Sequence, residues 1–258
     1  MSTDKLYFGG GAFGFSYYIG VLRALYENNH RASTVYGNSA GALMAMLYLL
    51  RMPTEDIDNL FQDVIRNTVA AIQSRPLDIS SYQLTEPNLR LFEVIRAKYP
   101  NAYKICNRRL HIGITKVTSG FQWKSRFSSN LELFNTLLCS YNIPFVCNYL
   151  AEIDGEKCID GCLGFNMSRH LPRDVFTIGA NDTNCVLNGQ IPTVHCLLPP
   201  PMESYHGYVE RGYNDMRGCD TATRPMITDE SSGLVWLAVF ACRLQPLCNK
   251  MYSRGNLR

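Results

Sequence analysis

Two glycine-rich loops near the start of the chain carry residues whose spacing suits acyl-transfer chemistry. The second loop, Gly37-Asn-Ser39-Ala-Gly41, has the G-x-S-x-G pattern of a nucleophile elbow, in which a serine stands on a sharp turn between a strand and a helix. The turn strains the serine backbone, and its neighbours must be small so that strand and helix can approach. The following helix directs the positive end of its dipole at the serine. We therefore predict Ser39 as a covalent nucleophile, with Gly37 and Gly41 completing the elbow.

The first loop, Gly9–Gly14, has the spacing G-x-G-x-x-G, which fits two functions. As a dinucleotide fingerprint it requires an acidic residue at the end of the next strand to hold the ribose. That strand instead ends in Gly37-Asn38-Ser39, which argues against a nicotinamide cofactor. As an oxyanion hole it needs backbone N–H groups that converge on one point, which consecutive glycines permit. We predict an oxyanion hole built from Gly9, Gly10, Gly11 and Gly14.

A serine nucleophile needs a base to accept its proton, and Asp160 is the strongest candidate. It follows the strand-like run Lys157–Ile159 and precedes Gly161, which allows a tight turn. A carboxylate can accept a hydroxyl proton directly if it lies within hydrogen-bonding reach. An ordinary Asp-Gly turn has the same pattern. The mechanistic rival is a His-dependent triad, whose base would be one of His30, His111, His170, His195 and His206.

None of the five histidines has a distinctive catalytic context. Two fall in strand-like runs (His111 and His195), one ends a helix (His30) and one falls on an expected helix (His206). His170 is the only one expected in a loop. We therefore predict that no histidine is required for the chemistry.

The elements that must position these residues alternate between strands and helices. The apolar patterns predict strands over Lys5–Phe8, Thr34–Tyr36, Leu110–Val117, Phe121–Phe127, Val175–Gly179 and Thr193–Leu198. They predict helices after a Ser16 cap, over Ala42–Leu50, from Thr54 to Ile72, over Asn88–Lys98 and Leu131–Tyr141, and in two pieces after Pro201. This alternation indicates an α/β fold with a mostly parallel sheet covered on both faces. With no repeat and no clear linker, we predict a single domain over residues 1–258.

Composition excludes several classes of protein. The 258 residues are 46% hydrophobic and 18% charged, as in a globular chain, and the net charge of +3 gives no reason to expect a nucleic-acid partner. The longest apolar run near a terminus, Gly233–Cys242, is shorter than the ~20 residues that a membrane-spanning helix needs. Without a recognisable secretory signal, we expect an intracellular protein, cytoplasmic or peripherally associated with a membrane.

The ten cysteines are expected to be reduced and mostly buried, because disulfide frameworks belong to small secreted domains. They lack the paired C-x-x-C spacing of a structural zinc site. We predict no metal and no cofactor.

Taken together, the motifs resemble those of the patatin-like phospholipase family. The resemblance rests on Gly-Gly-Gly-x-x-Gly at Gly9–Gly14, on the Ser39 elbow and on Ile159-Asp-Gly161, preceded by Ser140-Tyr-Asn-Ile-Pro-Phe145, and covers roughly residues 5–180. It implies a three-layer α/β/α fold and a catalytic Ser-Asp dyad, with Ser39 as nucleophile and Asp160 as base. It also implies a serine hydrolase of lipid degradation that cleaves carboxylic esters of phospholipids, lysophospholipids or neutral lipids. A lipid transacylase with the same dyad and a catalytically silent lipid-binding module are the alternatives.

Two residues depart from the family pattern. Phe13 stands where many members carry Arg or Lys before the last glycine of the first motif, which makes that loop more apolar. Cys162 stands where the family usually has a second glycine after Asp-Gly. Neither change removes a catalytic group.

One segment stands out for its charge. Between Arg96 and Arg126 the chain has eight basic residues and no acidic one, with aromatic residues interleaved. Such a segment can dock on an anionic membrane, where each charge contributes ~1 kcal/mol, or can simply be a solvated face. The residues are Arg96, Lys98, Lys104, Arg108, Arg109, Lys116, Lys124 and Arg126.

Overall fold

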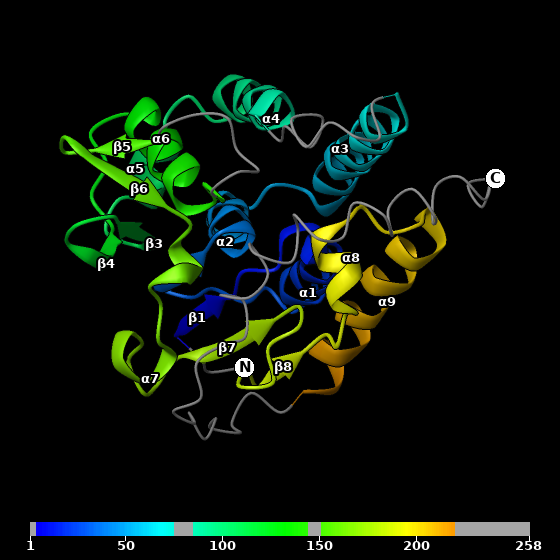
Figure 1. Cartoon of the computed structure of the whole chain (residues 1–258). Coiled ribbons are helices and arrows are strands. Elements are labelled where there is room, and N and C mark those ends of the chain that lie inside the picture. Colours follow the sequence, from blue (N-terminus) through cyan, green and yellow to red (C-terminus); the bar gives the residue numbers. More distant parts are fainter. Residues whose placement is uncertain (1–3, 75–84, 144–150, 220–258) are drawn as a thin grey trace.

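The described part of the protein is built around an eight-stranded sheet (Figure 1). The structure is a computed structural model and describes residues 4–74, 85–143 and 151–219. The strand order is β5-β6-β3-β2-β1-β7-β8, with β4 also paired to β3. The strands are β1 (Lys5–Phe8), β2 (Thr34–Asn38), β3 (Leu110–Lys116), β4 (Gly120–Lys124), β5 (Glu152–Ile153), β6 (Glu156–Ile159), β7 (Phe176–Gly179) and β8 (Leu187–Asn188).

The centre of the sheet is parallel. β1 lies between β2 and β7, so that Phe8 is paired with Gly37 on one side and with Ile178 on the other. β2 is in turn parallel to β3, with Asn38 opposite Gly113. The antiparallel pairings are those of β4 and β6 with β3, and of β5 with β6. Because parallel strands end at one edge, the segments after β1 and β2 emerge side by side.

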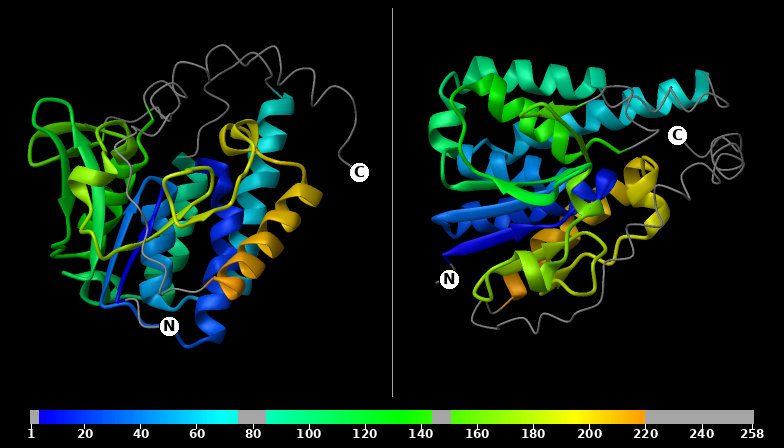
Figure 2. Two further views of the ribbon diagram at one scale, coloured as in Figure 1. Left: turned by 90° about the horizontal axis from the view of Figure 1, so that it is seen from below. Right: turned by 60° about the vertical axis from the view of Figure 1, so that its left-hand side comes forward.

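Helices lie on both sides of this sheet. They are α1 (Phe15–Glu27), α2 (Ala40–Leu50), α3 (Thr54–Ser74), α4 (Thr85–Lys98), α5 (Ala102–Cys106), α6 (Asn130–Ser140), α7 (Met167–His170), α8 (Thr193–Leu197) and α9 (Met202–Gly218), with short 3-10 turns η1 (Ala12–Gly14) and η3 (Gly161–Leu163). The larger layer includes α1, α3 and α9, to the right of the sheet in the left view of Figure 2. The other face is covered near β1 and β2 by α7, where Met167 packs with Tyr7 and Tyr36. The predicted three-layer α/β/α fold with a mostly parallel sheet is confirmed.

The main core forms where α2 crosses the sheet. Every residue from Ala42 to Leu50 is buried, as the absence of a polar face in this segment predicts. Its partners are the inward-facing strand residues Leu6, Val35 and Ile112. A helix buried in this way is held rigidly, which fixes the position of the loop at its N-terminus.

Helix α9 covers α1 through two close backbone contacts. A Cβ on Gly20 would clash with the carbonyl oxygen of Val209, and a Cβ on Gly212 would clash with the carbonyl oxygen of Tyr17. The glycines therefore permit the two helices to touch along their backbones (Figure 1). The first of the two helical pieces predicted after Pro201 is thus α9. The second piece and Gly233–Cys242 lie outside the described residues.

The predictions for Thr193–Leu198 and for the cap of α1 were wrong. Thr193–Leu198 alternates in polarity like a strand, but residues Thr193–Leu197 form helix α8. Pro192 precedes it with a backbone conformation suited to a helix start, and this outweighs the alternation. Ser16 does not cap α1. The capping position is Gly14, and the buried Ser16 hydroxyl has no hydrogen-bond partner among the described residues.

Six of the described cysteines are buried free thiols: Cys106, Cys139, Cys158, Cys162, Cys185 and Cys196. No helix within the described residues has the length and apolar composition of a membrane span.

Candidate active site

Ser39 stands on a strained turn between β2 and α2. Its φ and ψ angles are 52° and −130°, a conformation that non-glycine residues rarely adopt and that costs of order 1–3 kcal/mol. The Ser39 N–H donates to the Ser140 hydroxyl at 2.9 Å, and that hydroxyl donates to the Gly113 carbonyl at 2.7 Å. These two hydrogen bonds tie the strained peptide to α6 and β3. Ser39 is therefore held on a strained turn between a strand and a helix.

The small residues around Ser39 are required by close backbone contacts. A Cβ on Gly41 would clash with the carbonyl oxygens of Phe8 and Gly9, where α2 passes the end of β1. A Cβ on Gly37 would clash with the backbone of Gly41 and Ala42. Both glycines thus let the N-terminus of α2 approach the strand ends, and its dipole is directed at Ser39.

The register of β3 brings Asp160 to Ser39. β4 pairs with one edge of β3 over Ile112–Lys116, so β6 must share the other edge with β2. β2 ends at Asn38, opposite Gly113, and β6 runs the opposite way and ends at Ile159, opposite Thr115. The residues that follow the two strands meet beside β3. Gly161 is needed there, because its Cβ would clash with the carbonyl oxygen of Gly113.

The two side chains form a buried hydrogen bond. Ser39 Oγ donates to Asp160 Oδ2 at 2.7 Å, and the residues are 5% and 4% exposed. The other carboxylate oxygen accepts the Cys162 N–H at 2.8 Å, and the Asp160 N–H donates to the carbonyl of Asn142. Burial raises the pKa of Asp160, and the hydrogen bonds from Ser39 and Cys162 oppose that rise. A carboxylate held in this way can accept the serine proton.

The Gly9–Gly14 loop passes beside Ser39. A Cβ on Gly10 would lie 3.4 Å from the Ser39 Cβ, so the loop backbone is in contact with the turn at Ser39. Two of the four amides already donate to backbone carbonyls, Gly9 to that of Ile178 and Gly14 to that of Gly11. Gly10 and Gly11 are therefore the better candidates for oxyanion donors.

Tyr18 supports this loop in a way that the sequence motifs do not reveal. Its hydroxyl donates to the Gly9 carbonyl at 2.7 Å, lies 3.4 Å from the Gly10 carbonyl and accepts the Ala180 N–H at 3.0 Å. Each of these two carbonyls belongs to the peptide group whose N–H is that of the next glycine. Tyr18 therefore fixes the peptide planes of the Gly10 and Gly11 amides.

The family model for patatin-like phospholipase matches residues 6–171, which include both glycine loops and Asp160. The chain belongs to the patatin-like phospholipase family. It is 26% identical over 249 residues to the human (Homo sapiens) omega-hydroxyceramide transacylase, a match that covers 83% of this chain and 45% of the relative. It is 27% identical over 167 residues to 1-acylglycerol-3-phosphate O-acyltransferase Pnpla3 of Mus musculus, which covers 62% of this chain and 39% of that protein. The chain thus spans less than half the length of these curated relatives.

The histidines of this patatin-like chain have other hydrogen-bond partners than the Ser39–Asp160 pair where their ring contacts are known, as for His30, His170 and His195. Within the described residues, none forms a hydrogen bond with either member. His170 was expected in a loop but ends α7, where its Nδ1 accepts the Asn166 N–H. His195 was expected in a strand but lies on α8 beside Tyr208. His111 lies in β3 and His206 on α9. His30 follows α1, and its Nδ1 lies 2.8 Å from the Tyr48 hydroxyl.

The eight basic residues do not form one uniform surface. Three are in ion pairs, Lys98 with Asp56, Lys116 with Asp154 and Lys124 with Glu132. Arg109 donates to the backbone carbonyls of Ala32 and Ser33, and it precedes β3 at the edge of the sheet opposite to Ser39. The other four are exposed: Arg96, Lys104, Arg108 and Arg126.

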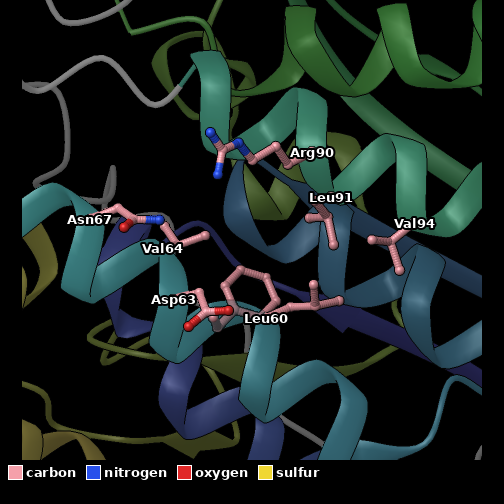
Figure 3. A pocket seen from close by; sticks show the side chains of 8 residues that line it. Leu60, Asp63, Val64, Asn67, Arg90, Leu91 and Val94 are labelled. Atoms are coloured by element: carbon pink, nitrogen blue, oxygen red, sulfur yellow. The ribbon is translucent and has the colours of Figure 1, made fainter.

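A pocket of about 240 Å³ lies between α3 and α4, with side chains from both helices directed toward it (Figure 3). Its lining includes Leu60, Phe61 and Leu91, and Phe61 packs on Phe15, the residue after Gly14, at 4.2 Å between ring centroids. Neither Ser39 nor Asp160 lines it. In the described part of the chain, no group of three or more His, Cys, Asp or Glu side chains is arranged to hold a metal ion.

Proposed function

We propose that this protein transfers acyl groups from lipid esters through an acyl-enzyme on Ser39, with water as the basal acceptor. This makes it a lipid acyl hydrolase of the phospholipase or lysophospholipase type. The observation that carries the proposal is the 2.7 Å hydrogen bond from Ser39 Oγ to the buried carboxylate of Asp160. A strained elbow at a helix N-terminus and a neighbouring glycine loop add the other parts that acyl transfer needs.

The first half-reaction forms the acyl-enzyme. Asp160 takes the Ser39 proton as Oγ bonds to the ester carbonyl carbon, and the carbonyl electron pair moves onto its oxygen. The Gly10 and Gly11 amides and the α2 dipole stabilise that oxyanion. When the carbonyl re-forms, the bond to the alcohol portion of the lipid breaks. Asp160 returns the proton to that leaving oxygen.

The second half-reaction releases the acyl group. Water replaces the alcohol, Asp160 accepts a proton from it, and the hydroxide oxygen bonds to the acyl carbon. Collapse of the second oxyanion breaks the bond to Ser39 Oγ, which regains its proton from Asp160. A free fatty acid leaves, and both residues return to their starting state.

The buried position of Asp160 suits a base. Burial raises its pKa, so the carboxylate binds a proton more tightly than a solvated aspartate does. Its second oxygen is held by the Cys162 N–H, which leaves Oδ2 directed at Ser39. Holding two reacting groups in this way removes part of the entropic cost of the reaction.

Transfer to an alcohol is the second candidate, and the relatives favour it. One is named as a transacylase and another as an O-acyltransferase. The same acyl-enzyme serves both outcomes, since the acceptor alone differs. A catalytically silent lipid-binding module is disfavoured, because it would have no need for the strained Ser39 backbone or the buried Asp160.

Product analysis tests this proposal. Vesicles of mixed phospholipid, lysophospholipid and triacylglycerol are incubated with the protein, with and without a long-chain primary alcohol, and products are identified by mass spectrometry. Free fatty acid that depends on Ser39 supports hydrolysis, and acyl ester of the added alcohol supports transacylation. If neither product depends on Ser39, the protein is not an acyl-transfer enzyme.

Peripheral membrane contact through the basic segment remains a weaker proposal. The four exposed basic residues can still attract an anionic surface, whereas the ion-paired lysines contribute less. Sedimentation with anionic vesicles decides this: replacing Arg96, Lys104, Arg108 and Arg126 with glutamine should weaken binding if docking uses this segment.

A further inference from the structure

The Cys162 side chain lies between Asp160 and the glycine loop. Its backbone N–H is fixed by the Asp160 carboxylate at 2.8 Å, at the start of the turn η3. Its sulfur lies so close to Gly10 that a Cβ on Gly10 would clash with it. Cys162 is buried, and its sulfur occupies the space that a side chain at position 10 would need.

The thiol has a partner on each side. Its sulfur lies against Gly10, and both the Asp160 carboxylate and the Gly10 N–H act on the pKa of the thiol. Burial raises the pKa of Cys162 well above its ordinary value, and the nearby Asp160 charge raises it further. The thiol therefore stays protonated at neutral pH and can act as a hydrogen-bond donor to the carboxylate.

The two contacts have different consequences. An S–H donated to Asp160 favours the charged form of the carboxylate, which is the form that accepts the serine proton. Sulfur is a weak acceptor, so the Gly10 N–H is kept in place without being strongly satisfied. An oxyanion that forms near Ser39 can then take over that amide.

We propose that Cys162 is a positioning residue that links Asp160 to the oxyanion loop by donating its S–H to the carboxylate and orienting the Gly10 amide. This inference rests on the proposed function, because it assigns Cys162 a part in the same acyl transfer. Glycine at position 162 would leave this space empty.

The test compares Cys162→Ala, Cys162→Ser and Cys106→Ala in the full chain. Serine keeps a donor and acceptor, whereas alanine removes both. Cys106 is a matched control, because it is also a buried free thiol but lies in α5. Folding is checked by thermal melting, and kcat and KM for a soluble p-nitrophenyl ester are measured from pH 4 to pH 9.

Loss of the S–H donor should displace the acid limb of kcat to higher pH. For Cys162→Ala we expect the acid limb to shift by about one pH unit. Loss of the contact with the Gly10 amide should in addition lower kcat at pH 7 roughly tenfold, with KM changed less than about twofold. Cys162→Ser should restore the acid limb, and Cys106→Ala should leave both kcat and the limb unchanged. A folded Cys162→Ala variant with the wild-type acid limb would overturn the proposal, as would a folded Cys162→Ser variant as displaced as Cys162→Ala.

Wild type, Ser39→Ala and Asp160→Asn run in the same assay separate this inference from the proposed function. If ester hydrolysis by the wild type does not depend on Ser39 and Asp160, the proposed function fails. If it does depend on them and the Cys162 variants behave like wild type, only the role of Cys162 fails.

Discussion

Replacing Tyr18 with phenylalanine should slow catalysis without removing any group that touches the substrate. The change deletes one buried hydroxyl and leaves the Gly9 carbonyl and the Ala180 N–H without that partner. A buried polar group left unsatisfied costs ~1–3 kcal/mol, so we expect the free energy of unfolding to fall by about 2–4 kcal/mol. A domain of ordinary stability, ~5–15 kcal/mol, survives this loss.

The effect on activity follows from the peptide planes that Tyr18 holds. Complete loss of an oxyanion donor lowers kcat by ~10²–10³-fold. Because Tyr18→Phe loosens the Gly10 and Gly11 amides without deleting them, we expect kcat to fall by about tenfold. KM should change less than about twofold, since the ground-state ester does not depend on these donors.

The neighbouring Tyr17 supplies a matched control. It lies on the same helix and is equally buried, but its hydroxyl donates to Asp215 of α9 at 3.0 Å. Tyr17→Phe should lower stability by about 1 kcal/mol and leave kcat unchanged. Thermal melting and steady-state hydrolysis of a soluble ester measure both quantities. Normal kcat in a folded Tyr18→Phe variant, or an equal loss of kcat in both variants, would refute the assigned role of Tyr18.

Three further predictions concern the base and the absence of other catalytic groups. Asp160→Asn should abolish turnover yet be at least as stable as wild type at pH 7. Burial raises the pKa of Asp160, so the stability that its neutral form provides is lost as pH rises through that pKa. Asparagine is neutral at every pH and does not incur this loss. Near-normal turnover, or a clearly lower melting temperature at pH 7, contradicts this. The five histidine-to-glutamine variants, at His30, His111, His170, His195 and His206, should each keep most of kcat/KM when folded, whereas a loss of three orders of magnitude in one of them would indicate a His base. Exhaustive EDTA treatment should leave hydrolysis unchanged, because the proposed base and oxyanion donors are groups of the chain itself; loss on chelation with rescue by calcium would contradict this.

The sequence predicted those features of the candidate site that depend on residues adjacent in the chain. The Ser39 elbow is one short motif between a strand and an apolar helix, so its turn and its small neighbours follow from local sterics. The alternation of strands and helices predicted the α/β class, and β1 has the predicted bounds. The hydrogen bond between Ser39 and Asp160 depends on how β2 and β6 are paired with β3. The order of the motifs along the chain does not determine that register.

The supporting residues could not be found in this way. Tyr18, Ser140 and Gly113 come from different elements and act through backbone contacts that exist only in the folded chain. Cys162 departs from a family pattern, which is visible in the sequence. Its contact with Gly10 depends on the packing of η3 against the glycine loop, which is not. The strand prediction for Thr193–Leu198 was wrong. Alternating polarity in so short a segment is a weak strand signal, and Pro192 favours the start of a helix there.

Covalent labelling of Ser39 tests the central claim most directly. A fluorophosphonate probe reacts with a serine that a base activates, and intact-mass and peptide mass spectrometry locate the adduct. We predict one adduct on Ser39 in the wild type and none in Ser39→Ala. A label that persists in the alanine variant, or that is located on another serine, would contradict the assignment of Ser39 as the nucleophile.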